Sequence, residues 1–460
     1  MDEELEQILE PDNGEGNESA VLQKIKADLH NQLLDMLDYD EARNIPLAKL
    51  HKECAERVDT LLRARQYPLS GPDRQRLLQE VLDEVFGFGP IEVFLRDPEV
   101  SDILINGPYQ IYIEKRGQLH RSNIKFLDDN HLMRIIKRIG TNVGRRIDES
   151  IPMLDARLPD GSRVNAIIPP LALDGPMVSV RRFGTIPIDI KRLLELDTLV
   201  QEMADFMQAC VQCKTNILIS GGTGSGKTTF LNSLSRWIPE GERVVTIEDA
   251  AELQLQRDHV VRLETRPPNI EGEGCITQRD LVRNSLRMRP DRIIIGEVRG
   301  GETLDMLQAM NTGHEGSMTT VHANSPRDAM RRLESMVSMS GVNHPIRAIR
   351  EQVSSAIHLI VQLERMTGGK RKVINIVEIT GMEGDTVCLH DIFRFNKTGV
   401  DESGNAKGNF EVCGVRPLLI NRLLERGVEL AHDMFQRRVL AGTRQVLTND
   451  RFTDRPNDRK

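Results

Sequence analysis

The spacing of hydrophobic residues changes along the chain, and each change predicts a different kind of element. Hydrophobic residues recur at helical spacing within 21–86, with breaks near Pro46 and over 67–72, which predicts a small bundle of three helices. Residues 87–183 carry short β-rich runs separated by Gly and Pro, together with one helical stretch over 131–139. This pattern predicts an α+β domain. Its strand-like runs are 101–106, 110–114 and 178–182.

From residue 198 onward, hydrophobic strands alternate with helical stretches. This alternation is typical of a parallel sheet wrapped by helices, so we expect an α/β domain over 198–440. The stretch 184–197, which contains Gly and Pro, predicts a linker or hinge between the two domains. Two later segments, 371–395 and 416–439, have the patterns of strands and of a helix, respectively.

The two ends of the chain have the composition of tails. Residues 1–20 contain eight acidic residues and no Lys or Arg, so they bury too little hydrophobic surface to offset the entropy of ordering, and we expect a disordered acidic tail. Residues 441–460 are polar and predict a second tail. The acidic start is unlike a secretory signal, and no hydrophobic run is as long as a membrane span, so we expect a cytoplasmic protein.

Cysteine usage and net charge argue against two kinds of site. The six cysteines are scattered over 460 residues, as in proteins from a reducing compartment. Cys210 and Cys213 form a CxxC pair, but no second pair completes a zinc site, so we expect helix-packing cysteines and no zinc. The net charge of -8 argues against a general nucleic-acid-binding surface.

The strongest signal in the sequence is a GxxxxGK[ST] phosphate-binding loop, or P-loop. A short hydrophobic strand precedes it and a helical stretch follows it, which is the context that ATP binding requires. Glycines let the backbone N–H groups curl around phosphates at a helix N-terminus. Lys227 is expected to reach the β- and γ-phosphates, and the Thr228 hydroxyl to bind Mg²⁺. The predicted nucleotide-binding residues are Gly221, Gly222, Thr223, Gly224, Ser225, Gly226, Lys227, Thr228 and Thr229.

Hydrolysis needs further groups, and the ends of two later strands supply candidates. Glu297 ends the hydrophobic strand that begins at Arg292, and we interpret it as the general base. Glu248 ends a second such strand, where it holds Mg²⁺ through water or helps to position the attacking water. Either acid taken alone is as well explained by a helix cap or a solvated turn. Their order after the P-loop favours function.

Two histidines flank a third strand-like segment that ends in TTVHAN. A histidine beside a γ-phosphate can sense it by hydrogen bonding, so His322 is a candidate catalytic residue. For His314, a phosphate-sensing role and a buried structural role explain the position equally well.

Four segments occur in the order GGTGSGKTT, VVTIEDAAELQL, LRMRPDRIIIGEVRG and TGHEGSMTTVHANSP. They resemble the Walker A, Asp, Walker B and His boxes of the type II/IV secretion ATPase superfamily. The upstream segments GFGPIE, VSDILINGP, LPDGSRVNAIIPP and VSVRRF resemble the CpaF/TadA branch in particular, the ATPases of tight-adherence (Flp-type) pili. The resemblance covers roughly residues 80–365, and its motifs are specific.

The resemblance implies a RecA-like P-loop NTPase domain in a homohexamer, with ATP between the N-terminal and C-terminal domains. It also implies an inner-membrane platform protein as partner, through which the motor assembles a type IV or tight-adherence pilus or drives type II-like secretion. Whether the motor also retracts the pilus stays open. Arg163, and Arg181 or Arg182, fall where family members place arginines that meet the γ-phosphate, and a guanidinium suits that role. From the residues alone, Arg181 and Arg182 look like a solvated strand end.

The sequence departs from related enzymes at two points. Position 296 is Gly where many P-loop enzymes carry a Walker B aspartate, so Mg²⁺ has to rely on Thr228, waters and Glu248. The four-cysteine zinc insertion of related type II secretion ATPases does not follow the His box, which favours the pilus branch.

Two other functions are compatible with the same boxes. One is a conjugative-type ATPase that transfers DNA or protein, against which the acidic net charge argues mildly. The other is a nucleotide-gated assembly scaffold with negligible turnover, against which the intact Lys227, Glu248 and Glu297 argue.

Overall fold

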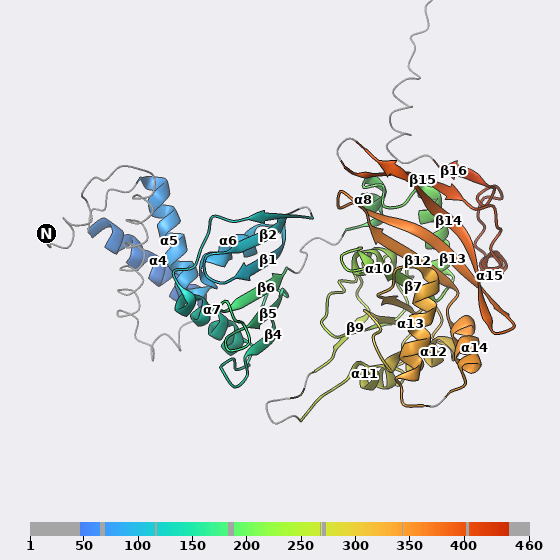
Figure 1. Cartoon of the computed structure of the whole chain (residues 1–460), viewed down its shortest axis with the longest axis horizontal. Coiled ribbons are helices and arrows are strands. Elements are labelled where there is room, and N and C mark those ends of the chain that lie inside the picture. Colours follow the sequence, from blue (N-terminus) through green and yellow to red (C-terminus); the bar gives the residue numbers. More distant parts are fainter. Residues whose placement is uncertain are drawn as a thin grey trace, which may run out of the picture. The chain divides into compact units, whose positions relative to one another are not determined.

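A computed structural model describes residues 47–64, 70–115, 117–182, 188–266, 268, 273–342, 344–401 and 404–440. The chain divides into two compact units, of which unit 1 ends at Thr185 and unit 2 begins at Ile186 (Figure 1). Both predicted tails, 1–20 and 441–460, lie outside the described residues. The first helix of the predicted three-helix bundle also lies outside them.

Unit 1 begins with a helical hairpin formed by α4 (Leu47–Ala64) and α5 (Gly71–Phe86). Ser70 starts α5 as its N-cap, because its hydroxyl accepts a hydrogen bond from the Asp73 N–H, and Pro72 suits the first turn. Helical spacing puts the hydrophobic residues of each helix on one face. That shared core consists of Cys54, Val58, Leu62, Leu77, Val81 and Leu82.

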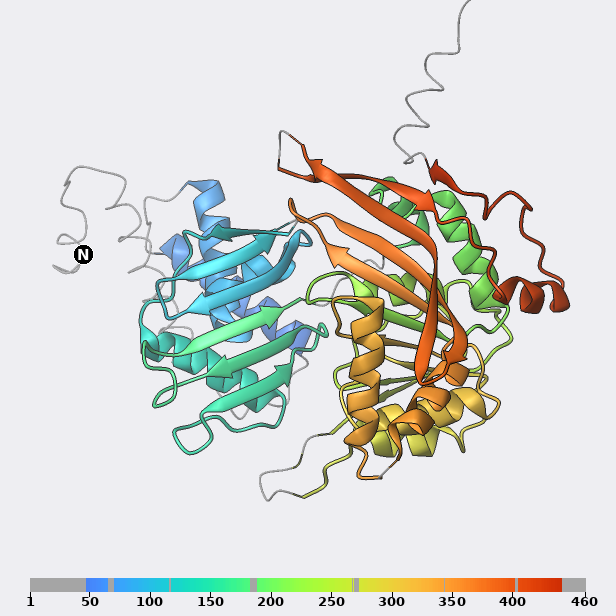
Figure 2. The same cartoon turned by 45° about the vertical axis from the view of Figure 1, so that its right-hand side comes forward.

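The rest of unit 1 is an antiparallel sheet of six strands with the order β3-β2-β1-β6-β5-β4. Alternate residues of β4, β5 and β6 are buried, so that one face of the sheet packs against α7 and the other is open (Figure 2). This one-sided burial is usual for antiparallel sheets. The elements are η1 (Gly89–Ile91), α6 (Glu92–Arg96), β1 (Val100–Asn106), β2 (Ile111–Lys115), β3 (Gln118–Arg121), α7 (Asp129–Asn142), β4 (Met153–Arg157), β5 (Arg163–Ile167) and β6 (Met177–Arg181).

Helix α7 connects the sheet to the helical hairpin. Asp128 caps the helix by accepting a hydrogen bond from the His131 N–H at 2.7 Å, and the hydrophobic side of the helix covers the sheet. The buried His131 ring lies with its Nε2 2.9 Å from a carboxylate oxygen of Glu84 on α5. Buried polar groups need such partners, so this pair fixes α5 against α7.

Unit 2 contains one sheet of ten strands, in the order β16-β15-β14-β13-β12-β7-β11-β10-β8-β9. The strands from β12 to β9 are parallel, and β13, β14, β15 and β16 extend the sheet beyond β12, each antiparallel to the strand before it. The strands are β7 (Ile217–Gly221), β8 (Val244–Glu248), β9 (Val260–Glu264), β10 (Arg292–Ile295), β11 (Met318–Val321), β12 (Leu359–Arg365), β13 (Arg371–Glu383), β14 (Thr386–Val400), β15 (Ala406–Val412) and β16 (Arg438–Leu440).

Helices cover both faces of this sheet, which explains why its central strands are hydrophobic throughout. Every residue of β7, β8, β10 and β11 is buried, as expected for parallel strands. Helices α9 and α10 share a core with one face, and α12, α13 and α14 with the other. The helices are α8 (Ile190–Glu195), α9 (Gln201–Gln212), α10 (Lys227–Ser235), α11 (Gln278–Ser285), α12 (Glu302–Asn311), α13 (Pro326–Ser338), α14 (Ile346–Ala356) and α15 (Leu419–Glu425).

The predicted α/β class, and the α+β class before it, are confirmed, but two local predictions need correction. The stretch 184–197 is not simply a linker, because it contains α8, which Asp189 caps and whose Leu193 is buried in the core of unit 2. The segment 416–439 is not one helix. Only α15 forms, and Gly427 then adopts a φ of +76°, a left-handed conformation that ends a helix.

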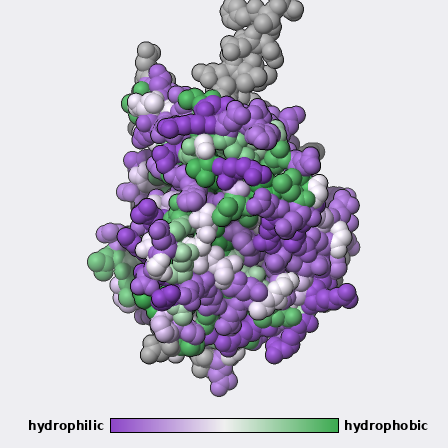
Figure 3. Space-filling model, turned by 90° about the vertical axis from the view of Figure 1, so that its right-hand side faces the viewer, coloured by the Kyte–Doolittle hydropathy of each residue, from purple (hydrophilic) through white to green (hydrophobic). Residues whose placement is uncertain are grey.

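Cys210 and Cys213 are both buried in the core beside α9, as expected for packing cysteines, and burial raises the pKa of each thiol. On the face in Figure 3, hydrophilic residues predominate and hydrophobic residues form small groups. Within the part of the chain that the structure describes, no helix combines the length and hydrophobicity needed to cross a membrane.

Candidate nucleotide site

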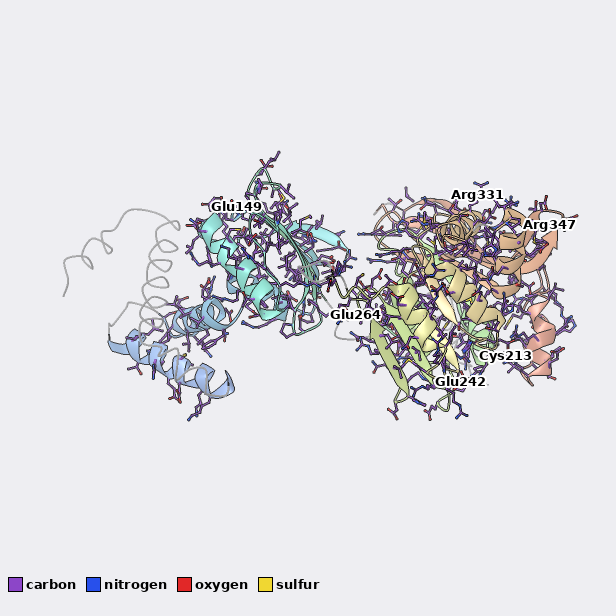
Figure 4. The ribbon with its side chains drawn as sticks, turned by 90° about the horizontal axis from the view of Figure 1, so that it is seen from below. Glu149, Cys213, Glu242, Glu264, Arg331 and Arg347 are labelled. Carbon is purple, nitrogen blue, oxygen red and sulfur yellow. The ribbon has the colours of Figure 1, made fainter. Side chains whose placement is uncertain are left out.

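The carboxyl ends of the parallel strands bring the predicted site residues of unit 2 to one edge of its sheet. The P-loop follows β7, Glu248 ends β8, Glu297 follows β10, and His322 follows β11. Parallel pairing makes these ends neighbours, the usual place for chemistry in such sheets. Figure 4 shows Glu264, which ends β9, well apart from Glu242, which precedes β8 at the opposite edge.

The P-loop joins β7 to α10 in the geometry that the motif predicts. Gly226 precedes the first residue of α10 with a φ of +93°, a backbone conformation that glycine adopts without strain. The Ser225 hydroxyl donates a hydrogen bond to the Gly222 carbonyl at 2.8 Å and so closes the loop on itself. Thr228 and Thr229 follow in the first turn of α10, where both are half-buried. The start of the helix therefore faces the loop as an anion site.

Lys227 occupies the inside of this loop. Its Nζ donates to the carbonyl oxygens of Gly221 and Gly222, at 3.0 and 3.1 Å. Burial lowers the pKa of Lys227, while the nearby Glu297 raises it and Arg299 lowers it further. The lysine is therefore a partly desolvated cation inside the loop, and two acids, Glu297 and Glu252, and one arginine, Arg299, are close enough to influence its pKa.

Glu297 is held by two partners in the structure. Its Oε2 accepts a hydrogen bond from Arg299 at 2.7 Å, and its backbone carbonyl accepts one from the Gln278 side chain at 3.1 Å. Arg299 also approaches Asp249, with 3.5 Å between its Nη1 and the carboxylate Oδ2. Arg299 thus bridges the acidic ends of two neighbouring strands and fixes the Glu297 carboxylate in direction.

Glu248 is in a different environment, although it lies one strand away. Its side chain is buried, and its Oε2 accepts hydrogen bonds from the backbone N–H groups of Glu252 and Leu253 at 2.7 and 2.9 Å. Burial raises the pKa of Glu248 to about 7, although these two hydrogen bonds oppose the shift. Its other oxygen, Oε1, is buried and has no hydrogen-bond partner among the described residues.

Steric crowding by Glu248 explains why position 296 is glycine. A Cβ placed there would lie 2.9 Å from Cγ of Glu248 and 3.3 Å from its Oε2, closer than side chains normally approach. The Glu248 side chain therefore fills the space that a Walker B aspartate would need. The sequence departure noted at Gly296 follows from the position of Glu248.

The two histidines lie at opposite edges of the sheet. His322 directly follows β11 at the edge of the P-loop, and its neighbour Asn324 places Oδ1 4.0 Å from where a Cβ on Gly222 would lie. His314 precedes β11, and its buried Nδ1 has no hydrogen-bond partner among the described residues. His322 therefore lies at the end of the strand where the P-loop lies, and His314 lies at the other end, so the position of His314 does not favour a phosphate-sensing role.

The predicted arginines of unit 1 differ from one another. Arg163 on β5 and Arg181 on β6 are directly opposite each other on the open face of the sheet, with side chains 43% and 63% exposed. Each pairs with a carboxylate, Arg163 with Asp155 at 2.9 Å and Arg181 with Asp102 at 3.2 Å. Arg182, in contrast, donates to the backbone carbonyls of 97 and 100 at the start of β1. Its guanidinium stabilises unit 1, so the exposed pair is better suited to meet a ligand.

Several residues that organise the site carry no motif of their own. Arg299 and Gln278 hold Glu297, and Glu302 accepts hydrogen bonds from the backbone N–H groups of Arg299 and Gly300 at 2.6 and 2.7 Å. The spacing of Arg299 and Glu302 after Glu297 was visible in the GEVRGGE segment, but it predicts no particular geometry. Gln278 lies on α11, and only the folded structure brings it near.

A magnesium ion fits the residues present, although the protein itself offers few ligands. No group of three His, Cys, Asp or Glu side chains is placed to hold a metal ion within the described ranges. Magnesium commonly takes one or two protein oxygens and completes its shell with phosphates and water. The unpaired Oε1 of Glu248 and the half-buried Thr228 at the start of α10 suit that mode.

Comparison with known proteins gives a family match over most of the chain. Residues 84–417 match the family described as Type II/IV secretion system protein. A putative conjugal transfer protein of Mycobacterium tuberculosis is 34% identical over 339 residues, which are 69% of this chain and 96% of that protein. The type IV secretion system protein PtlH of Bordetella pertussis is 33% identical over 336 residues, 67% of this chain and 96% of that protein.

Among solved structures, the VirB11 ATPase from the Brucella suis type IV secretion system, in complex with sulphate, is similar to this chain. It is 27% identical, with a TM-score of 0.34, over 62% of this chain and 94% of that chain.

Proposed function

Because the chain belongs to the Type II/IV secretion system protein family, we propose that it hydrolyses ATP in the P-loop of unit 2 and so drives transport through the cell envelope. The observation that carries this proposal most is the arrangement around Lys227. The lysine lies inside the loop, and Glu297 and Arg299 are near enough to change its pKa. Lys227, the cation that would bind the phosphates, and Glu297, the candidate general base, therefore belong to one site.

Hydrolysis follows from exchange of partners in this site. Arriving phosphates would replace the Gly221 and Gly222 carbonyls as partners of Lys227, a stronger interaction because both groups are charged. Glu297 would accept the proton of the attacking water, and Arg299 would keep its carboxylate in the required direction. The P-loop N–H groups would hold the β-phosphate as negative charge develops on it.

Magnesium would be held by Thr228 directly and by Glu248 through water. When bound, it neutralises charge on the phosphate oxygens. The raised pKa of Glu248 would fall again beside a cation, since an opposite charge favours the ionised carboxylate. Glu248 is thus prepared to gain a charge when the site fills.

The remaining candidate residues are assigned as part of the same proposal. His322 would sense the γ-phosphate from the end of β11. Arg163 and Arg181 would supply positive charge from unit 1, in a homohexamer in which ATP lies between N-terminal and C-terminal domains. A planar guanidinium suits this task because it can hold two phosphate oxygens at once.

Two transport roles deserve separate tests. The upstream segments that resemble the CpaF/TadA branch support a motor that acts on an inner-membrane platform protein to assemble a tight-adherence pilus. The names of two relatives, a conjugal transfer protein and a type IV secretion protein, support the alternative of DNA or protein transfer. We retain the pilus motor as the leading hypothesis because the net charge of -8 disfavours a DNA-binding ring.

The first experiment is steady-state phosphate release by the purified chain with Mg²⁺ and ATP, compared with Glu297→Gln. Loss of the general base should reduce turnover by about 100-fold or more while ADP affinity changes little. Glu264→Gln is a matched control, because Glu264 ends β9, two strands away from β10, at the same edge of the sheet. No turnover by the unaltered chain, alone or with membranes that contain its partners, would reject the ATPase proposal.

The transport role is tested by adding single- or double-stranded DNA to the same assay over a range of salt. Stimulation that weakens as salt rises would favour DNA transfer, because phosphate contacts release counterions. Turnover that ignores DNA and rises with inner-membrane vesicles would favour the platform-protein motor. Light scattering on the same samples measures whether the chain forms hexamers.

A further inference from the structure

Two arginines lie opposite each other in the hairpin of β12 and β13. Arg365 ends β12, Arg371 begins β13, and the two residues are direct register partners. Both guanidiniums stay charged at any physiological pH, and like charges directly opposite in a sheet lower stability. The adjacent register pair, Glu364 and Lys372, has opposite charges, as is usual. The arginine pair therefore breaks a rule that the same hairpin follows one position earlier.

Both arginines lie against the P-loop. The Arg371 Nε donates to the Gly224 carbonyl at 3.3 Å, and its Cγ lies 3.7 Å from where a Cβ on Gly226 would be. The Arg365 Nη1 lies 3.4 Å from where a Cβ on Gly224 would be. The hairpin thus places two positive charges at the crest of the loop, within the same unit as the loop itself.

The negative charge of the expected ligand can explain why two arginines lie beside the loop. A nucleoside triphosphate carries several negative charges, whereas the loop offers Lys227 and a helix N-terminus worth roughly half a charge. Glycine at position 224 puts no side chain between the loop and Arg365.

We propose that Arg365 and Arg371 form a second phosphate clamp, which binds the phosphates of a nucleoside di- or triphosphate seated in the P-loop. This inference rests on the proposed function, since it adds residues to that nucleotide site. A phosphate bound there would meet two guanidiniums in addition to Lys227, each able to hold phosphate oxygens. Arg371 also holds the Gly224 carbonyl and so keeps the crest of the loop in place.

The direct test is calorimetric titration of the full chain with ADP, for Arg365→Gln and Arg371→Gln separately. Each substitution should weaken ADP binding by about tenfold or more, as expected for the loss of a charge-assisted hydrogen bond. Arg426→Gln is the matched control. Arg426 pairs with Glu315, which precedes β11 at the opposite edge of the same sheet. The Arg426→Gln chain should therefore bind ADP as tightly as the parent chain. Unchanged affinity in both hairpin variants would overturn the clamp.

Inorganic pyrophosphate distinguishes phosphate binding from contact with the base or the ribose. If the arginines hold phosphates, the same variants should weaken pyrophosphate and ADP by similar factors. A variant that loses ADP affinity but binds pyrophosphate normally would contradict the proposal, because its arginine would then act on the nucleoside part.

Thermal unfolding separates a binding role from a structural one. Without ligand, Arg365→Gln should melt at the same temperature as the parent chain or above it, because the substitution removes a like-charge contact. The rise in melting temperature on adding ADP should become smaller. A lower melting temperature without ligand, together with an unchanged rise, would mean that the arginine serves the hairpin only.

Failure of this inference can be told from failure of the proposed function. If the parent chain binds neither ADP nor pyrophosphate, the nucleotide site itself is wrong. If the parent chain binds and hydrolyses ATP while both arginine variants behave like it, only the clamp is wrong.

Discussion

The two units prepare their charged residues in different ways. In unit 2, the backbone holds two of the site residues: Lys227 donates to loop carbonyls, and Glu248 accepts from backbone N–H groups. In unit 1, side chains hold the candidate arginines, since Arg163 and Arg181 pair with Asp155 and Asp102 on an open sheet face. Backbone partners are fixed by the fold, whereas exposed ion pairs are worth little and exchange easily.

This difference indicates separate tasks for the two units. The residues of unit 2 are positioned before any ligand arrives, which is the condition for electrostatic stabilisation of charge during reaction. Under the proposed function, the arginines of unit 1 would have to leave their own carboxylates to meet a phosphate. We therefore expect changes at Lys227 of unit 2 to affect ligand binding, changes at Glu248 to affect stability, and changes at Arg163 and Arg181 of unit 1 to affect turnover alone.

The largest effect is expected from Lys227→Ala. Removal of the only cation inside the loop should weaken ADP binding by about 100-fold or more and abolish phosphate release, because a charged partner of the phosphates is lost. The melting temperature without ligand should change little, since the side chain contacts loop carbonyls rather than the core. Calorimetry and a thermal melt measure both. A chain that no longer folds would show instead that Lys227 supports the structure.

The next largest effect is expected from Arg163→Gln and Arg181→Gln in unit 1. If these arginines stabilise charge on the transferred phosphate, each change should lower turnover by about 100-fold or more, with ADP affinity and melting temperature nearly unchanged. Arg146→Gln, which removes another exposed arginine paired with an acid in unit 1, is the control. Equal activity in all three variants would remove the arginines of unit 1 from the mechanism.

Glu248→Gln should change how stability depends on pH. The pKa of Glu248 in the folded chain, about 7, lies above the ordinary value of 4.5, so the folded state binds a proton more tightly than the unfolded state. The free energy of unfolding therefore falls as pH rises from about 4.5 to about 7.

The Glu248→Gln chain should not lose stability in this way, because glutamine does not ionise. Its free energy of unfolding should exceed that of the parent chain by almost nothing at about pH 4.5 and by at most about 3 kcal/mol above pH 7. Chemical unfolding without Mg²⁺ at a series of pH values measures the difference. A constant difference between the two chains across that range would contradict the assignment.

A smaller effect on stability is expected from Gly296→Ala. The added methyl group would press on Cγ of Glu248, which two backbone hydrogen bonds hold in place, and such overpacking costs about 2 kcal/mol. Adding Glu248→Ala should restore most of the loss, because the crowded side chain is then gone. A double variant that is as unstable as the sum of the two single variants would show that the residues do not interact.

Local patterns allowed much of the fold to be predicted from sequence. The P-loop strand and helix, the α/β class and the runs at 101–106 and 178–182 follow from hydrophobic spacing and glycine placement, which act over a few residues. The mixed sheet could not be predicted in this way. Whether the strands of 371–395 join the parallel strands depends on pairing between distant segments, and the helix expected over 416–439 was ended by Gly427.

The candidate site divides along the same line. Motifs indicated Lys227, Glu248 and Glu297 because each directly follows or ends a hydrophobic strand. The choice between Arg181 and Arg182 required the register of β6, since neighbouring residues on a strand face opposite sides. Arg365 and Arg371 belong to no motif, and only the pairing of β12 with β13 brings them together beside the loop.

The position of the P-loop strand inside its sheet has a consequence for the time at which a newly made chain becomes active. Strand β7 pairs with β11 and β12, which lie far downstream, so its hydrogen bonds cannot form until those strands have left the ribosome. A nascent chain that ends before β12 therefore has the whole P-loop sequence but lacks a neighbour for its strand. We therefore expect nucleotide binding to be delayed until most of unit 2 has been synthesised.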